Sequence, residues 1–251
     1  MKTVDVGMIT KNSEHCLEEC LETIYREIPV NSLIVVDGYS TDRTLEILKK
    51  FDEKHENVKV LQDRGTRATA RQKCIENVET EWFVFVDSDV ILSKDWFRRA
   101  WKRVNDDVGA VWGPNVDIIP NFYNNFFNSL YYRVEVESFK ARGGLHDTLI
   151  RREAVEDVNI PARLHFYEDA FLLDWIKKKG YKVEIGEDFY CLHLRPRSDW
   201  EVKSMLIEAY DQIKYGLVYS RKFKYTLLYP FHVLYGLIQL DKNARIEAKD
   251  S

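Results

Sequence analysis

The feature that most constrains the fold of this chain is a run of five bulky apolar residues that ends in two carboxylates. The segment Trp82–Val86 (WFVFV) contains no polar residue and is followed directly by Asp87, Ser88 and Asp89. Such a strand is typical of a parallel sheet that is covered on both faces. Ligands of open α/β sheets bind at the carboxyl ends of the strands. The two carboxylates can face one cation there, or the segment can be a solvated turn that caps the next helix.

The first half of the chain alternates apolar strand patterns with amphipathic helix patterns. We expect strands at Val4–Thr10, Leu33–Val36, Val58–Leu61, Trp82–Val86 and Val108–Trp112. We expect helices at Glu14–Ile28, from Ser40 or Thr41 to about Lys54, at Ala68–Asn77 and after Ser93, with Ser40 or Thr41 capping the second and Ser93 the fourth. In the second helix, Leu45 and Leu48 should face the core. This order predicts an α/β fold with a mostly parallel sheet, right-handed crossovers and flanking helices.

The second half of the chain is more irregular. It predicts an aromatic-rich helix at Asn121–Phe139, a strand at Thr148–Arg151, a short helix at Arg152–Val158, a helix at Glu168–Lys179, a strand at Tyr181–Ile185 and a helix at Trp200–Tyr215. The Glu168–Lys179 helix is the most distinct of these, because Gly180 follows it and lysines fill its last turn.

The charge and cysteine content limit the classes of function. The 251 residues carry a net charge of −4, which argues against general nucleic-acid binding. Four cysteines without a Cys-x-x-Cys pair indicate reduced thiols in a cytoplasmic protein. The first residues lead straight into a strand pattern without a signal peptide, and no apolar stretch reaches the roughly 20 residues of a membrane-spanning helix.

Four motifs, taken in order, resemble those of the inverting glycosyltransferases of family two, which have the GT-A fold. They are Val35–Thr44 (VVDGYSTDRT), Gly65–Arg71 (GTRATAR), Phe85–Asp89 (FVDSD), and Tyr167–Leu172 (YEDAFL) closing with Lys179–Val183 (KGYKV). Each motif is short, and their common order and spacing make the resemblance specific over about residues 3 to 195. It implies a nucleotide-sugar-binding half at residues 1–115, an acceptor-binding half at 116–198 and a helical, aromatic-rich C-terminal extension at 199–251.

The resemblance implies a nucleotide-diphosphate sugar donor, linked to uridine or guanosine, and Mn²⁺ or Mg²⁺ as cofactor. An acidic protein can hold a diphosphate only if a cation or local basic groups neutralise it. By resemblance, Asp89 ligates the metal and Asp87 binds the ribose or a metal-bound water. His193 is expected as a further metal ligand, with a structural role as the alternative. Arg67 and Arg71 are expected on the nucleotide or diphosphate, unless they form a solvated pair on one helix face.

Four further residues are expected to bind the nucleotide. Asp37 would accept a hydrogen bond from the base. The commonest family pattern, Asp-Asp-Gly-Ser, is altered here, because Gly38 stands at the second aspartate and Tyr39 at the glycine. A tyrosine at this position can stack on the base or shield it. Thr10 and Asn12 occupy the loop after the first strand, where they contact the nucleotide or only cap the next helix.

Inversion requires a carboxylate that takes the proton of the acceptor hydroxyl. We expect Asp169 to be this general base, with Glu168 as the second candidate. Both open a helix, where the helix dipole favours negative charge, so an ordinary acidic first turn is the alternative. A phosphate acceptor would need no base. His146, after the Gly143–Gly144 turn, is a candidate for the neighbourhood of the acceptor.

The segment 221–245 is relevant to the choice of acceptor and to possible contacts with a membrane or a second copy. Thr226–Leu240 is apolar and aromatic, with basic residues on both sides. It packs on the core or on a second copy in a homodimer, or it forms an interfacial helix on anionic lipid at the inner face of the cell membrane. The lipid interpretation favours a polyprenyl-phosphate acceptor. Otherwise the acceptor is a sugar or a protein.

Three other classes of function are less consistent with the sequence. A sugar-1-phosphate nucleotidyltransferase would need a glycine-rich first loop, and Thr10–Ser13 contains no glycine. A phosphatase of the haloacid-dehalogenase type carries Asp-x-Asp after its first strand, whereas here the motif follows the fourth. A non-catalytic nucleotide-sugar-binding relative would have no need for the carboxylates Asp89, Glu168 and Asp169.

Overall fold

The computed structural model describes residues 2–117, 143–194, 210 and 213–215. The chain divides into two compact units, Met1–Ile118 with Gly143–Leu194, and Ile119–Arg142 with Arg195–Ser251. Nearly all described residues belong to the first unit. The expected Asn121–Phe139 helix, most of the Trp200–Tyr215 helix and the segment 221–245 lie outside the described residues, and the three-part division of the chain stays a prediction.

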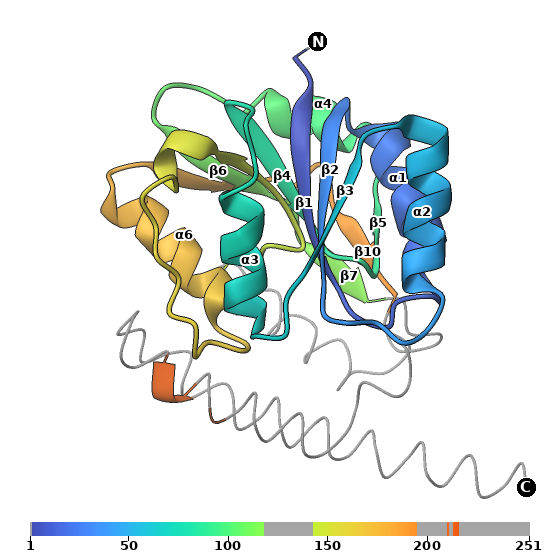
Figure 1. The fold of residues 1–251 in the computed structure, drawn as a ribbon. Helices are drawn as coiled ribbons and strands as arrows, with labels where there is room; N and C mark the ends of the chain where they lie inside the picture. The colour runs from blue at the N-terminus through green and yellow to red at the C-terminus, as the bar shows by residue number, and fades with distance from the viewer. Residues whose placement is uncertain (1, 118–142, 195–209, 211–212, 216–251) are drawn as a thin grey trace, which may run out of the picture. The chain divides into compact units, whose positions relative to one another are not determined.

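The first unit alternates strands and helices along its first half, as expected (Figure 1). The strands are β1 (Val4–Thr10), β2 (Val30–Asp37), β3 (Val58–Gln62), β4 (Trp82–Val86), β5 (Val90–Leu92), β6 (Val108–Trp112), β7 (Asn115–Asp117), β8 (Asp147–Arg151), β9 (Lys182–Ile185) and β10 (Cys191–His193). The α-helices are α1 (Leu17–Glu27), α2 (Thr44–His55), α3 (Arg67–Ile75), α4 (Trp96–Trp101) and α6 (Glu168–Lys178). In place of the expected helix after Arg151, a single 3₁₀ turn spans Arg152–Ala154.

Seven strands form the main sheet in the order β3-β2-β1-β4-β8-β6-β9. The four on one side, β3, β2, β1 and β4, run parallel to one another, which confirms the mostly parallel sheet. Strand β8 runs antiparallel to both of its neighbours, β4 and β6. The parallel order brings the carboxyl ends of β1, β2, β3 and β4 to one edge of the sheet, where ligands of such folds bind.

Both faces of the central strands are buried, as the unbroken apolar run in β4 predicts. One face packs on α1, α2 and α4, where Val84 shares a core with Leu21, Leu48 and Phe97. The other face carries Phe85, whose ring lies under the guanidinium of Arg71 from α3. Because neighbouring residues of a strand point to opposite faces, alternate residues of β4 belong to the two apolar layers on either side of the sheet.

Two of the expected helix starts are wrong. Helix α2 begins at Thr44, whose backbone N–H donates to Asp42 Oδ1 at 3.0 Å, whereas the Ser40 hydroxyl donates to Asp37. Helix α4 begins at Trp96, and the Ser93 hydroxyl accepts the backbone N–H of Tyr190 instead. In α2, Leu48 is buried as expected, but Leu45 is 36% exposed.

A second, three-stranded sheet was not expected from the sequence. Its order is β5-β10-β7, with β10 antiparallel to β5 and parallel to β7. Within it His193 pairs with Val90, and the backbone N–H of Leu194 donates to the carbonyl of Asp89 at 2.8 Å. This pairing fixes the end of β10 beside the residues that follow β4.

A search of the described residues for a helix with the length and apolar character of a membrane span finds none.

Candidate active site

Polar residues gather where the parallel strands end. Thr10 at the end of β1 pairs with Asp37 at the end of β2, and Asp37 pairs in turn with Gln62 at the end of β3. Asp87 follows β4 directly, and its backbone N–H donates to the carbonyl of His146 at 3.0 Å. The residues expected at the nucleotide therefore stand along one edge of the sheet.

Asp87 is held by a buried arginine. Its carboxylate forms an ion pair with the Nη2 of Arg71, a residue of α3 that is 2% exposed. Burial raises the pKa of Asp87, but the charge and hydrogen bond of Arg71, together with His146 and Arg67, outweigh burial and hold that pKa below its usual value. Asp87 is therefore ionised near neutral pH, and its negative charge is balanced inside the protein.

Asp89 and His193 form a second, hydrogen-bonded pair in the site. The Nε2 of His193 lies 3.0 Å from Oδ2 of Asp89, and the two side chains are 16% and 28% exposed. Adjacent ligands of an octahedral Mg²⁺, each at about 2.1 Å, stand about 3.0 Å apart. A carboxylate oxygen and an imidazole nitrogen at this spacing, open to solvent, suit one divalent cation.

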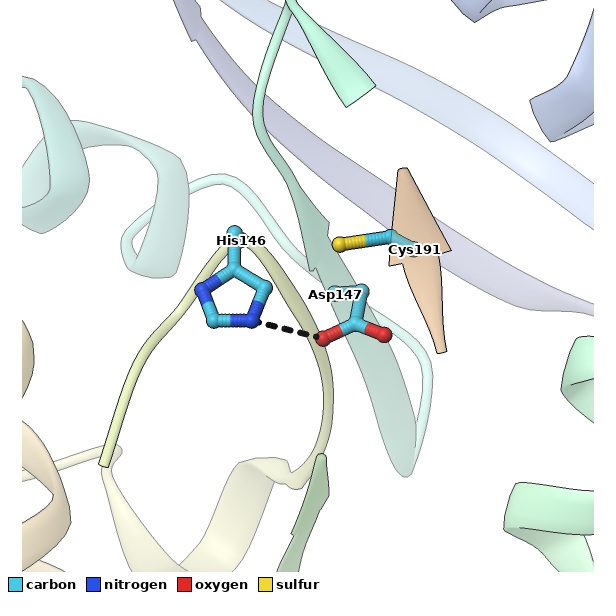
Figure 2. A group of neighbouring side chains, drawn as sticks. All are labelled: His146, Asp147 and Cys191. Atoms are coloured by element: carbon cyan, nitrogen blue, oxygen red, sulfur yellow. Dashed lines mark ion pairs between the residues drawn. The ribbon is translucent and has the colours of Figure 1, made fainter. Parts of the chain in front are cut away.

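A second group of side chains also has metal-binding chemistry. Figure 2 shows His146, Asp147 and Cys191 close together, from the start of β8 and from β10. Their possible ligand atoms all lie within 4.8 Å of one another. The three side chains are buried, and Asp147 accepts the indole N–H of Trp96 at 2.8 Å and the backbone N–H of Gly113 at 3.3 Å.

Protonation argues against a cation in this buried group. Burial raises the pKa of Asp147 well above its usual range, and burial also lowers the pKa of His146. Both shifts favour the neutral forms, and His146 donates its Nε2 proton to the Gly113 carbonyl at 3.1 Å. The pair Asp89 and His193 is also hydrogen-bonded, but its side chains are partly exposed, whereas the trio is buried, so a cation reaches the pair more readily.

Helix α6 brings two more carboxylates to the same region. Glu168 is 4% exposed, and burial, with the charge of Asp169 beside it, raises its pKa to about 7 against the opposing effect of Arg67 and Arg71. Asp169 is half-buried and accepts the backbone N–H of Ala170 at 2.6 Å. Its charge also acts on His146, so the start of α6 and the start of β8 face the same space.

The loop after β2 is tied to the loop after β1. The Ser40 hydroxyl accepts the backbone N–H of Asn12 at 2.8 Å, and Asn12 Oδ1 accepts the backbone N–H of Thr41 at 2.9 Å. The carboxylate of Asp37 is fully buried and accepts the backbone N–H of Ser40 at 3.0 Å. Asp37 and Asn12 thus fix the shape of this loop, whatever they contact in a ligand.

A chain of hydroxyl groups links the first loop to the turn after β4. Thr10 Oγ1 donates to Ser13 Oγ at 3.0 Å, and Ser13 Oγ lies 2.9 Å from Ser88 Oγ. Ser13 was not expected in the site. The sequence signal for Ser13 is that it is a small hydroxyl residue three positions after Thr10. The loop after β1 and the turn after β4, which contains Ser88, must meet at the same sheet edge.

The structure brings most of the expected site residues together. Strand pairing, hydrogen bonds or ion pairs involve Thr10, Asn12, Asp37, Arg71, Asp87, Asp89 and His193, and the charges of Glu168 and Asp169 act on Arg71 and His146, respectively. Arg67 is exposed and lies with its guanidinium 4.9 Å from the Phe166 ring, while its charge reaches Asp87 and Glu168. Tyr39 is exposed and contacts Arg64, which the sequence did not mark. The assigned roles of these residues stay predictions.

The sequence of the chain is similar to that of known glycosyltransferases. The family model described as Glycosyl transferase family 2 matches residues 5–161. A poly(ribitol-phosphate) beta-glucosyltransferase of Bacillus spizizenii is 30% identical over 197 residues, which cover 72% of this chain and 31% of that protein. The chain spans between about a fifth and a third of the curated relatives that it first matches, at 21% and 31% of their length.

Two solved structures share the fold. The mannosyltransferase PcManGT from Pyrobaculum calidifontis, in complex with GDP-Man and Mn²⁺, has a TM-score of 0.65 and 20% identity over 93% of this chain and 70% of that one. S. aureus TarS 1–349 in complex with UDP-GlcNAc has a TM-score of 0.58 and 19% identity over 84% of this chain and 67% of that one. At such identities the likeness establishes the fold alone.

Proposed function

Because the chain belongs to glycosyl transferase family 2, with a GT-A fold, we propose that it is a metal-dependent glycosyltransferase. It moves a sugar from a nucleoside diphosphate donor to an acceptor hydroxyl or a lipid phosphate, with inversion at the anomeric carbon. The observation that carries this proposal is the pair Asp89 and His193, 3.0 Å apart and open to solvent, next to an ionised Asp87.

The metal is assigned to Asp89 and His193, with Asp87 on the ribose or on a metal-bound water. Mn²⁺ or Mg²⁺ bound there would neutralise the diphosphate and so favour its departure. The solved relative with Mn²⁺ and GDP-Man supports a divalent cation in this fold. The trio His146, Asp147 and Cys191 is the competing location, and its burial and the hydrogen bonds of Asp147 to Trp96 and Gly113 speak against it.

Asp169 is assigned as the general base. It is half-buried, and its charge acts on His146 and Glu168. The charge of Asp87 also acts on His146, so Asp169 and Asp87 border the same region. Glu168 is less suited to this role, because its side chain is 4% exposed and so less accessible to an acceptor than that of Asp169.

The relatives indicate the chemical class of the donor and of the acceptor, and not the individual compounds. One relative carries a guanosine-linked and another a uridine-linked sugar, so both donors stay open. Poly(ribitol-phosphate) is the acceptor named for one relative, which adds a polyol phosphate to the candidate sugar, protein and polyprenyl-phosphate acceptors.

Sugar release tests the proposal. The protein would be incubated with a panel of uridine and guanosine diphosphate sugars, with Mn²⁺ and with a chelator, and nucleoside diphosphate release would be measured. We expect release from at least one donor, dependent on the metal and lost in Asp89→Ala, while Asp106→Ala, a substitution on an exposed loop, behaves as the unaltered protein. Metal-dependent nucleotide binding without any release would instead favour the non-catalytic relative.

The stereochemistry of the product tests inversion separately. Proton NMR of the first glycoside formed should show the anomeric configuration opposite to that of the donor. Retention of configuration would contradict the single displacement assigned to Asp169.

A further inference from the structure

Tyr39 occupies a backbone conformation that ordinarily disfavours its side chain. Its φ is +59°, in the left-handed region, and among the described residues the other non-glycine positions of this kind are Asn12, Glu56 and Asp95. Asparagine and aspartate tolerate this region because their short polar side chains bond locally, and Glu56 is a helix cap. Neither reason applies to a bulky aromatic residue, and strain of this kind tends to persist at functional sites.

Burial of the tyrosine ring does not offset the strain. Tyr39 is 41% exposed, which makes it one of the more exposed large hydrophobic side chains in the described part of the chain. What covers its ring is the guanidinium of Arg64, whose Cζ lies 4.3 Å from the ring centroid. Arg64 is itself exposed, so the two side chains form a layer on the surface and contribute little to the core.

The positions of the two residues follow from the sheet. Asp37 pairs with Gln62 across β2 and β3, and Tyr39 and Arg64 each lie two residues beyond that pair. Both therefore emerge at the carboxyl edge where the nucleotide is expected to bind.

The backbone beneath the pair is pinned by hydrogen bonds. Asp37 binds the backbone N–H of Ser40, and Asn12 bonds to both Ser40 and Thr41. On the other side, the backbone N–H of Gly65 donates to Asp63. The loops are thus fixed, while the ring of Tyr39 and the long side chain of Arg64 can change rotamers.

We propose that Tyr39 and Arg64 form a clamp that holds the nucleobase of the donor between the phenol ring and the guanidinium plane. The inference rests on the proposed function, and it adds Arg64 as a donor-binding residue. A base presents two π-faces, and aromatic rings and arginine planes both stack on such faces. The side chain of Arg64 swings off the ring to admit the base and then closes on its other face. Because stacking is indifferent to base identity, the clamp supplies affinity and leaves the choice between uracil and guanine to other groups.

Three variants separate the clamp from ordinary surface packing. Tyr39→Gly removes the ring and the backbone strain together, Tyr39→Phe keeps the ring, and Arg64→Ala removes the guanidinium. Tyr190→Ala and Arg98→Ala are the matched controls, since Tyr190 is 43% exposed and Arg98 is an exposed residue of α4. Binding of UDP, GDP and inorganic pyrophosphate, each with Mn²⁺, would be measured by calorimetry, together with the melting temperature.

If the clamp exists, Tyr39→Gly should weaken nucleotide binding without lowering the melting temperature. Tyr39→Gly and Arg64→Ala should weaken the nucleoside diphosphate that the unaltered protein binds by about five- to a hundredfold, while pyrophosphate binding stays unchanged. Tyr39→Phe and both controls should bind as the unaltered protein does. Tyr39→Gly should melt at the same temperature or higher, because glycine adopts positive φ without strain.

Two results would overturn the inference alone. Nucleotide binding unchanged in both Tyr39→Gly and Arg64→Ala would reduce the pair to surface packing, and an equal loss of pyrophosphate binding would assign it to the diphosphate. If the unaltered protein binds no nucleoside diphosphate at all, the proposed function fails, and the clamp fails with it.

Discussion

At the scale of single residues, Asp89 is the group on which metal binding depends most. Removing a hydrogen-bond partner of a metal ligand typically costs 10- to 100-fold in affinity, so losing the ligand itself should cost at least about 100-fold. We expect Asp89→Ala to weaken Mn²⁺ binding, measured by calorimetry, by that factor without lowering the melting temperature, because the carboxylate lies at a strand end and is 28% exposed. Asp147→Asn should leave Mn²⁺ affinity unchanged. A larger loss in Asp147→Asn than in Asp89→Ala would move the cation to the buried trio.

The two carboxylates at the start of α6 can be told apart by kinetics. A general base contributes on the order of 10²- to 10⁴-fold to a rate. Asp169→Asn should therefore lower kcat by about 100-fold or more while the donor Kd changes little, because the base acts in the transition state. Glu168→Gln should lower kcat much less. If the order of the two effects is reversed, Glu168 is the base.

Glu168 also gives a pH dependence of stability. Its pKa is about 7 in the folded protein and has a reference value of 4.5, so the folded state binds the proton more tightly than the unfolded state. The proton on Glu168 therefore stabilises the folded protein, and this stabilisation is complete below about pH 4.5. It is lost as the pH rises through about 7, which lowers the free energy of unfolding by roughly 3 kcal/mol in total. Urea unfolding should show that the stability of Glu168→Gln relative to the unaltered protein rises over this interval. A constant difference between pH 5 and pH 8 would mean that Glu168 is ionised throughout.

At the scale of elements, the ion pair of Arg71 and Asp87 joins α3 to the end of β4. Arg71 is 2% exposed, whereas the Asp87 side chain is 31% exposed and can regain water when its partner is lost. Asp87→Asn leaves a buried cation without its ion-pair partner and should cost about 3 kcal/mol, while Arg71→Met should cost roughly 1–2 kcal/mol. Urea unfolding of the two variants measures this difference. Equal losses, or a larger loss for Arg71→Met, would show that packing on Phe85 outweighs the charge.

The elements that could be predicted are those with a strong apolar pattern. Trp82–Val86 matches an observed strand in full, because residues buried on both faces leave an unbroken apolar run, and the mainly apolar segments Val4–Thr10 and Val108–Trp112 also match in full. Helix starts were less certain, since Ser40 and Ser93 make their hydrogen bonds to distant residues instead of to the helix. Short strands such as β5 and β10 were missed, because three residues carry too little pattern to distinguish a strand from a loop.

The same limit applies to the candidate site. Asp37, Asp87 and Asp89 are readable from the sequence, because polar residues that end buried strands stand out. Arg64 is not readable, since an exposed arginine in a polar loop looks ordinary until the neighbouring strand places Tyr39 beside it. Nor does the sequence reveal that Asp147 is fully buried and bonded to Trp96 of another element, since that contact depends on the tertiary fold.

At the scale of the whole molecule, the segment 221–245 offers a test of membrane contact. A basic residue near an anionic surface contributes about 1 kcal/mol, so reversing three charges should reduce binding by at least about 100-fold. We expect the triple variant Arg221→Glu, Lys222→Glu and Lys224→Glu to lose co-sedimentation with vesicles that contain phosphatidylserine. Reversal of Lys49, Lys50 and Lys54, exposed on α2, is the matched control. Equal sedimentation of both variants would remove the lipid interpretation and favour packing on the core or on a second copy.

Anomalous diffraction at the manganese edge, from crystals soaked with Mn²⁺ and either UDP or GDP, tests the central claim most directly. The account predicts one manganese peak bridging Asp89 and His193, with the diphosphate oxygens of the nucleotide bound to it at the carboxyl edge of β1, β2 and β4. A peak at His146, Asp147 and Cys191, or a nucleotide bound away from this edge without metal, would contradict it.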